Sequence, residues 1–504
     1  MASRLTQSFS FHQSPEAFIS RRLQQFALAS AEQEANGRAN PIIRAEILDR
    51  NVHLISSYRL CKAILCASED SEDQHDAPPG LMRLENDGAP ATGNDSPVPP
   101  GTFAVRPAYA FFPPPNMLLE DGAQHRKHKR LWQTLFANVV GAANPLIRDV
   151  TLKAFVVPLK KFPAAVPSDL YETLKTLAWD ILLAIFLGVE RDNVGGVSRN
   201  VEDLQETILR GQFSLFPAAV RTPFWTSPRS RGLKAVQDLE PAVRSRLRSQ
   251  WESSVSGKHE TCPFTRYITP AKDCNDETLS EDDLTSHYRQ QSAGVSADCI
   301  LHESVHVADR GQQEQSLANL IRQQQDFPTR RAILSSALRE TMRLSPPVIG
   351  VMRRVTQTVR LTNPGSDRNS TTSHIVPAAH DAWLYFVAAN RDPDVFARPT
   401  EFCWDRFMRQ GAEVPTDEDC GIAFGLGPKH CLGADLTREI CLTVAETVME
   451  SGLAIKGGGQ VVEGVKAWLG WEAHAGPEAM TRDLKQLPCQ RPRDPVMVTV
   501  TYAK

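Results

Sequence analysis

The sequence lacks any stretch that approaches the roughly 18 consecutive apolar residues of a membrane-spanning helix. Its N-terminus also lacks the apolar segment that directs secretion. The ten cysteines have no paired short spacings of the kind that indicate a disulfide framework. These absences predict a cytoplasmic protein with no transmembrane segment, in which most cysteines are reduced.

Acidic residues are scarce at the start of the chain, where the first is Glu16 and residues 1–26 are rich in Ser and Arg. This composition has two interpretations. The favoured one is a soluble amphipathic helix, and the alternative is a transit peptide for an organelle.

A strong excess of one charge sign is missing too, since the net charge is -3. The charge therefore gives no electrostatic reason to expect a nucleic-acid partner. With 41% hydrophobic residues over 504 positions, the chain can bury a large core. We expect a single, monomeric domain over residues 1–504.

Helical patterns predominate and strands are in the minority. Residues 67–104 are rich in Pro, Gly, Asp and Glu, which predicts a long loop or a disordered segment. The predicted helices cover residues 15–36, 58–66 and most of 118–347, with another just after Cys431, and the predicted strands lie within 41–57, 351–361 and 380–388. The fold class is therefore mainly α with a small β-rich part.

The stretch FGLGPKHCLG, Phe424 to Gly433, presents one cysteine in a glycine-rich turn at a predicted helix start. Glycine allows positive φ and close approach of the backbone to a flat partner, while proline stiffens the turn. The helix dipole and free amide donors favour the thiolate of Cys431. Such a thiolate suits a soft metal.

The full pattern F-x-x-G-x-x-x-C-x-G is present as Phe424, Gly427, Cys431 and Gly433. It resembles the haem-binding loop of the cytochrome P450 family, in which the cysteine is the axial iron ligand. The resemblance implies the P450 fold and haem b as cofactor.

Upstream, Glu340 and Arg343 form E-x-x-R, whose side chains share one helical face and can form an ion pair. The segment NRDPDVFARPTEFCWDRF resembles the family's meander and places Arg406 as a third member of this network. In the resemblance these three residues are structural.

The segment EDGAQHRKHKRLWQTLF resembles the family's C-helix, where His125 and Lys129, at (i, i+4), would bind a haem propionate. Arg353, or alternatively Arg354, and His430 would be further anchors. This basic run has another interpretation, as a solvated surface or a docking surface. In the family, an acidic reductase binds this face of the protein.

The family's distal oxygen-activation motif is poorly matched here. In SAGVSADC, Ala293 and Gly294 fit, but Ser296 stands in place of the acid and Ala297 in place of the first Thr. Asp298 is one position away, about 100° around a helix. The missing alcohol leaves the proton source open.

The resemblance therefore implies two functions. The first is a monooxygenase that receives electrons from NADPH through a cytochrome P450 reductase and oxidises a small hydrophobic, secondary-metabolite-like substrate. The second is an isomerase, dehydratase or peroxygenase on the same scaffold, suggested by Ala297. Substrate identity depends on residues 67–117 and 205–225, where the family match is poor.

A rival pattern follows the distal motif. HESVH, with His302, Glu303 and His306, matches the zinc-peptidase signature H-E-x-x-H. No third ligand is evident, and this hypothesis explains neither the Cys431 loop nor the Glu340 pattern.

Overall fold

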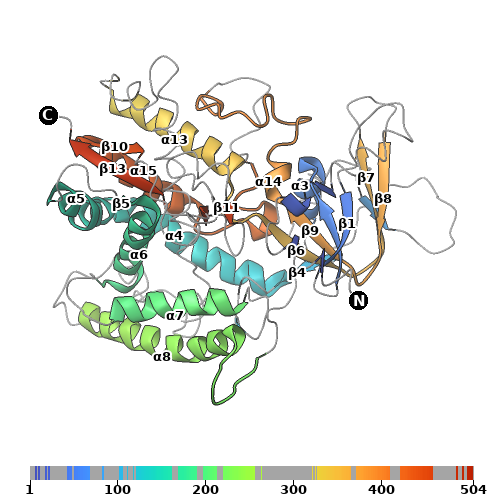
Figure 1. Cartoon of the computed structure of the whole chain (residues 1–504), viewed down its shortest axis with the longest axis horizontal. Helices are drawn as coiled ribbons and strands as arrows, with labels where there is room; N and C mark the ends of the chain where they lie inside the picture. Colours follow the sequence, from blue (N-terminus) through green and yellow to red (C-terminus); the bar gives the residue numbers. More distant parts are fainter. Residues whose placement is uncertain are drawn as a thin grey trace, which may run out of the picture.

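Most helices lie to one side of the molecule and most strands to the other, as Figure 1 shows. The computed structural model describes residues 6–7, 10–11, 17–19, 21–22, 42–47, 50–67, 82–84, 102–105, 111, 117, 121–161, 168–189, 197–212, 219–255, 263, 321, 324, 326–364, 371–408, 421–457, 484–485, 491–492 and 496–502. The predicted class, mainly α with a small β-rich part, is confirmed.

The helical side is built around α4 (Gly122–Thr151), which continues through a π-helical turn (Leu152–Val156) into α5 (Val157–Lys161). Its buried face, with Trp132, Phe136 and Ile147, forms a core together with apolar side chains of the other helices. These are α6 (Leu170–Leu187), α7 (Val197–Gln212), α8 (Pro228–Val255), α13 (Phe327–Leu344) and α15 (Ala434–Glu450).

The main sheet has the strand order β1-β2-β9-β6-β4. Its strands are β1 (Ile42–Ile47), β2 (Arg50–Ile55), β4 (Phe103–Val105), β6 (Gly350–Val355) and β9 (Asp381–Tyr385). Neighbours are antiparallel except β2 and β9, which run parallel. The helix α3 (Tyr58–Cys66), predicted over the same residues from sequence, packs its apolar side chains with those of this sheet.

A smaller sheet, β3-β7-β8, combines β3 (Met82–Leu84), β7 (Val359–Pro364) and β8 (Thr371–Val376). Another, β10-β13-β5, combines β10 (Leu453–Gly457), β13 (Met497–Tyr502) and β5 (Ser168–Asp169). Two short elements, β11 (Leu484–Lys485) and β12 (Arg491–Pro492), pair with each other.

The expectation that residues 67–104 form only loop is wrong in two places. β3 pairs with β7, and β4 begins at Phe103 and pairs with β6. Short apolar strands inside a polar segment acquire their structure from distant partners, so local composition alone does not reveal them. Of the helix predicted over 15–36, only a few residues are described.

Candidate functional site

The cysteine-containing stretch is a tight loop between a short 3-10 helix (Gly427–Lys429) and α15. The Cys431 N–H donates to the Phe424 carbonyl over 2.9 Å, which closes the loop on itself. Gly427 has φ +63°, and a Cβ there would lie 2.9 Å from the Leu65 carbonyl oxygen of α3. Any larger residue at this position would strain the backbone and displace α3.

The Cys431 sulfur lies at the N-terminal end of α15, where it accepts hydrogen bonds from the Gly433 and Ala434 N–H groups. Its pKa is nevertheless raised, because desolvation by the surrounding protein outweighs these amides and the nearby Lys129 and Arg438. The helix terminus lowers the pKa as the sequence predicted, but desolvation raises it more, so the free thiol is protonated.

Cys431 is also exposed, although it lies deep enough in the molecule to be desolvated. The two observations are compatible if the sulfur faces an opening that protein atoms surround. Among the described cysteines, Cys61, Cys403 and Cys441 are buried. Among the described cysteines, only Cys431 is both exposed and close to the backbone N–H groups at the start of a helix.

Side chains that sequence reasoning did not single out hold this loop in place. Lys429 forms a 3.1 Å ion pair with Asp121 at the start of α4. The Arg438 guanidinium lies 5.2 Å from the centre of the Phe424 ring. These contacts join positions far apart in sequence or on different sides of a turn, and no local pattern signals them.

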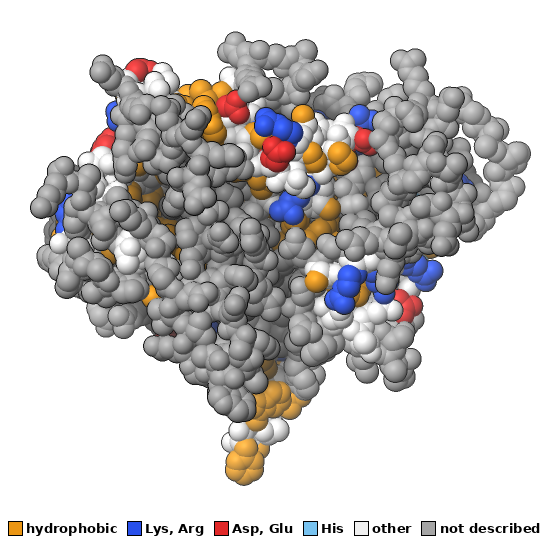
Figure 2. All heavy atoms as spheres, turned by 45° about the horizontal axis from the view of Figure 1, so that its top comes forward, with side chains coloured by type: hydrophobic (Ala, Val, Ile, Leu, Met, Phe, Trp, Pro, Cys, Tyr) orange, Lys and Arg blue, Asp and Glu red, His pale blue; other side chains and the backbone are white. Residues whose placement is uncertain are grey.

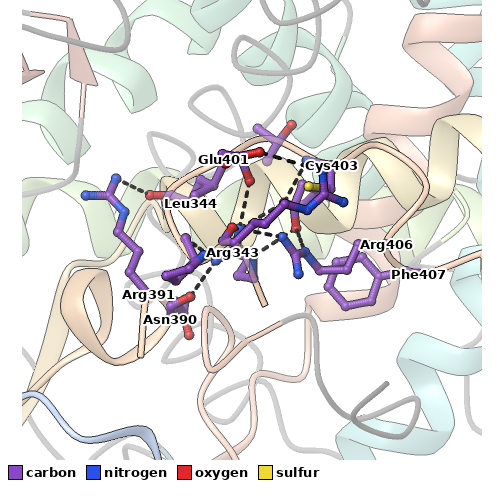
Figure 3. A network of polar contacts seen from close by, with 12 residues as sticks. Arg343, Leu344, Asn390, Arg391, Glu401, Cys403, Arg406 and Phe407 are labelled. Atoms are coloured by element: carbon purple, nitrogen blue, oxygen red, sulfur yellow. Dashed lines mark hydrogen bonds and ion pairs between the residues drawn. The ribbon is translucent and has the colours of Figure 1, made fainter. Parts of the chain in front are cut away.

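Behind the loop, Glu340 and Arg343 are both 0% exposed and form two hydrogen bonds of 2.8 Å with each other. Arg406 Nε reaches the same carboxylate at 2.9 Å. The Cys403 N–H also donates to Glu340, over 2.9 Å. The structure thus brings together the three residues that the sequence grouped. Figure 3 shows Arg343 and Arg406 in this network.

Backbone carbonyls accept the remaining guanidinium protons of this cluster. Arg343 Nη1 donates to the Asn390 and Pro399 carbonyls, each at 2.7 Å. Arg406 donates to the Ala397 carbonyl at 2.7 Å and to the Arg398 carbonyl at 3.2 Å. The buried charges are therefore satisfied by several chain segments at once, which fixes these segments relative to α13.

Asn390 connects this cluster to the cysteine loop. Its carbonyl accepts from Arg343, while its side-chain Oδ1 accepts from the Ile422 N–H at 2.8 Å. The Ile422 carbonyl then accepts from Gly425, three residues on. A continuous hydrogen-bonded path thus runs from the α13 ion pair to the turn that carries Cys431.

The basic residues expected near the cofactor occupy different environments. His125 of α4 is 3% exposed, and Lys129, one turn later, donates to the Pro428 carbonyl of the loop. Burial is the main cause of the lowered pKa of His430, with Lys129 and Arg438 adding to it. α4 and the loop therefore meet on the face that carries these groups.

Arg353 and Arg354, the two alternatives on β6, are distinguished by the structure. Arg354 pairs with Asp381 at 3.1 Å and is about 40% exposed on its side chain. Arg353 is 7% exposed, and burial lowers its pKa. Within the described residues no ion pair joins it to a carboxylate, and its guanidinium donates to the neighbouring Met352 carbonyl. A buried guanidinium in this position is well suited to receive an anion.

Ser296, Ala297 and Asp298, together with Ala293 and Gly294, lie outside the described residues. So do His302, Glu303 and His306 of the zinc-type pattern. The distal side and the rival site therefore remain sequence-based predictions.

Comparison with known proteins shows what this chain resembles. The family model described as Cytochrome P450 matches residues 301–450. The solved structure described as retinoic acid bound cyanobacterial CYP120A1 aligns with a TM-score of 0.67 at 16% identity and covers 99% of this chain and 96% of that chain. The chain has the cytochrome P450 fold, and its residues 301–450 match the P450 family model.

Among curated P450 proteins, the putative cytochrome P450 120 of Synechocystis sp. is 25% identical over 281 residues, covering 53% of this chain and 57% of the relative. A melianone-derivative synthase of Melia azedarach, (21S)-21-acetyl-1-hydroxy-apo-melianone synthase CYP88A164, is 24% identical over 294 residues, 54% of each chain. The chain thus spans about half the length of these curated relatives. The P450 family match begins at residue 301 and so includes His302, Glu303 and His306.

The described side chains around this loop fit a haem group. The exposed Cys431 offers a soft sulfur ligand at a helix start, and the buried Arg353 offers a cation for a carboxylate. Among the helices that the structure describes, none is long and apolar enough to cross a membrane.

Proposed function

We propose that the protein is a haem-thiolate monooxygenase that oxidises a small hydrophobic, secondary-metabolite-like substrate. The observation that carries the proposal is the position of Cys431, which is exposed at the N-terminal end of α15, beside the Gly433 and Ala434 amides. Haem bound through such a thiolate supplies the electron density that favours cleavage of the O–O bond of dioxygen.

Cys431 would be the axial ligand of the iron, and the Gly433 and Ala434 amides would tune it, because hydrogen bonds to a coordinating sulfur withdraw electron density from it. Phe424, Gly427 and Gly433 would shape the loop that lies against the porphyrin. The carboxylates of haem b would bind the basic face formed by His125, Lys129, Arg353 and His430.

Glu340, Arg343 and Arg406 would have a structural role. Their path through Asn390 supports the turn that presents the sulfur. A ligand must be held to within a fraction of an ångström for a stable metal–sulfur bond, so this rigid backing is an important part of the site.

Arg353 and Arg354 provide a matched pair of variants for the basic face. We expect Arg353→Gln to lower the ratio of haem to protein and Arg354→Gln to leave it near the wild-type value. Absorbance gives that ratio, and circular dichroism confirms that both variants are folded. Equal haem content in both variants would remove Arg353 from the proposed anchors.

The source of the distal proton separates monooxygenation from the second candidate reaction. A positioned general acid typically contributes about 10² to 10⁴ in rate. With Ala297 in place of a threonine, Ser296, Asp298, the substrate or water would have to donate this proton. The alternative is an isomerase, dehydratase or peroxygenase that does not activate dioxygen.

The test uses holoprotein with NADPH, a cytochrome P450 reductase and ¹⁸O₂, after a substrate has been found by difference spectra. Monooxygenation predicts one ¹⁸O atom in the product and strict dependence on NADPH and reductase. Turnover without both, or with peroxide alone, would support the second candidate. Metal analysis separates either from the zinc-peptidase hypothesis, which predicts zinc in place of iron.

A further inference from the structure

The first turns of α15 carry an ion pair close to the cysteine loop. Arg438 Nη1 donates to Asp435 Oδ1 over 2.9 Å, and the two residues are at (i, i+3) on one face of the helix. The Arg438 side chain is 23% exposed, whereas that of Asp435 is 78% exposed. The cation is thus largely covered by protein, and its carboxylate partner lies in solvent.

The guanidinium of Arg438 also lies against the loop itself. It is 5.2 Å from the centre of the Phe424 ring, a cation–π contact that links α15 to the start of the loop. The Phe424 carbonyl accepts the Cys431 N–H over 2.9 Å, so the ring and the cysteine belong to one hydrogen-bonded turn. Helix and loop together therefore fix the position of the Arg438 charge relative to Cys431.

The charge of Arg438 reaches the residues around the sulfur. Desolvation raises the pKa of the Cys431 thiol, while backbone amides, Lys129 and Arg438 act to lower it. The pKa of the neighbouring His430 is lowered by burial and then by the same two cations, whereas Asp435 acts to raise it. Asp435 thus opposes the field of Arg438 at the loop.

Lys129 and Arg438 differ in what else they do. Lys129 donates to the Pro428 carbonyl, so its removal would also take away a contact that joins α4 to the loop. Arg438 has a partner, Asp435, that lies in solvent outside the loop and can be neutralised separately. On the face that Figure 2 shows, Lys and Arg side chains are interspersed with Asp and Glu side chains. Distant charges therefore largely cancel, and the nearest ones dominate at the sulfur.

We propose that Arg438 and Asp435 set the reduction potential of the haem iron bound through Cys431, with Arg438 raising it and Asp435 lowering it. A cation close to the sulfur stabilises the additional electron of the reduced state, and a nearby anion has the opposite effect. Groups that surround a metal ligand tune the reduction potential of the metal. Arg438 is a positioning residue, since it acts through the sulfur and does not need to touch the bound group. The effect rests on the haem-thiolate function proposed above.

The test is a spectroelectrochemical titration of the holoprotein, which measures the ratio of reduced to oxidised protein at each applied potential. At the wild-type midpoint, Arg438→Gln should lower this ratio about fourfold, since one partly buried unit charge is removed. Asp435→Asn should raise it about twofold, because solvent screens the exposed carboxylate more strongly. Opposite signs identify an effect of charge, since a loss of packing would not shift the two variants in opposite directions.

Two further variants separate the charge of Arg438 from its shape and from its position. Arg438→Lys keeps the charge but not the planar guanidinium, and its ratio should lie close to that of wild type. Arg148→Gln removes an arginine that pairs with Glu450 at the opposite end of α15, and its ratio should equal that of wild type. The spectrum of the reduced carbon monoxide complex, recorded for every variant, shows whether the thiolate is still the ligand.

Two results would overturn the role of Arg438. One is a midpoint potential that neither Arg438→Gln nor Asp435→Asn changes while both keep the thiolate spectrum. The other is a shift of both variants in the same direction. If Arg438→Gln does not retain haem, Asp435→Asn decides, and a midpoint equal to that of wild type would overturn the proposal. A wild-type protein without the thiolate spectrum would refute the haem-thiolate function itself, and the role of Arg438 with it, so the two failures are distinguishable.

Discussion

Two polar clusters hold different parts of this protein together by different means. Behind the Cys431 loop, Glu340, Arg343 and Arg406 are ionised groups joined by hydrogen bonds of 2.8 to 2.9 Å. At the far end of the main sheet, His53 of β2 lies between two other imidazoles. Its Nδ1 is 2.8 Å from His374 Nε2, and its Nε2 is 2.8 Å from His380 Nδ1.

The histidine cluster connects two sheets, since His53 belongs to the main sheet, His374 to β8 of the smaller sheet, and His380 to the turn before β9. Burial is the main cause that lowers the pKa of His53 to about 3, and the neighbouring histidines and Arg44 add to it. Burial is also the main cause that lowers the pKa of His374, and Arg44 adds to it. The pKa of His380 is lowered by burial first and then by Arg44 and Arg354, whereas Asp381 raises it. The cluster is therefore neutral at neutral pH.

The comparison shows that burial favours either full ionic pairing or full neutrality. Guanidinium groups remain charged over the whole accessible pH range, so the Glu340 cluster depends on its partners being present. Imidazoles change charge near neutral pH, so the His53 cluster depends on the solution. Substitution should therefore remove the stability that the first cluster contributes, and low pH should remove that of the second.

The largest effect is expected from breaking the ionic cluster at its carboxylate. Glu340→Gln leaves two guanidinium groups without their anion, one of them fully buried, and should cost about 3 to 5 kcal/mol of unfolding free energy. Urea unfolding measures it. The control is Glu401→Gln, since Glu401 forms a surface pair with Arg398 at 3.6 Å. Equal destabilisation by the two variants would contradict the structural role of Glu340.

A smaller effect is expected from acid acting on the histidine cluster. The folded pKa of His53 is depressed below the ordinary value of 6.5, so the unfolded chain binds more protons as the pH falls below 6.5. The resulting stability is present above that pH and is lost at about 1.4 kcal/mol per pH unit below it, until the folded group also titrates. Unfolding free energy at a series of pH values from about 7 to 5 measures this loss.

His53→Gln sharpens that experiment, because an amide can still hydrogen-bond but does not titrate. The variant should be less stable than wild type at pH 7 and should show a shallower loss toward pH 5. A slope identical to that of wild type would mean that His53 is not the group that responds to acid.

The smallest effect concerns the shape of one cation in the ionic cluster. Arg406→Lys keeps the charge beside Glu340 but cannot reproduce the fork that also reaches the Ala397 and Arg398 carbonyls. A loss of about 1 to 2 kcal/mol is expected, since two hydrogen bonds to backbone carbonyls are lost. Thermal unfolding of Arg406→Lys and of Arg398→Lys, a surface control, tests it. If Arg406→Lys is as stable as the control, charge alone accounts for the role of Arg406.

Local patterns predicted much of the fold and the core of the site. The helix over 58–66 follows from its apolar periodicity, and the (i, i+3) spacing placed Glu340 beside Arg343. The fixed spacing within the loop placed Cys431 at the start of α15. In each case the partners are close in sequence, so the period of the helix or the length of the turn determines their contact.

Contacts between distant segments could not be predicted in this way. His53 lies more than three hundred residues from His374, and Lys429 is equally far from Asp121. The exposure of Phe224 is likewise contrary to sequence expectation, because large aromatic residues are usually buried. Such features depend on which chain segments meet, and that is decided by the packing of the whole molecule.

The most direct test of the account is the spectrum of the reduced carbon monoxide complex in wild type, Cys431→Ala and the control Cys66→Ala, whose cysteine is half-buried near the loop. The account predicts the red-shifted Soret band typical of thiolate ligation in wild type and in Cys66→Ala, and its loss in Cys431→Ala. A wild-type spectrum in Cys431→Ala would contradict the assignment of Cys431 as the axial ligand.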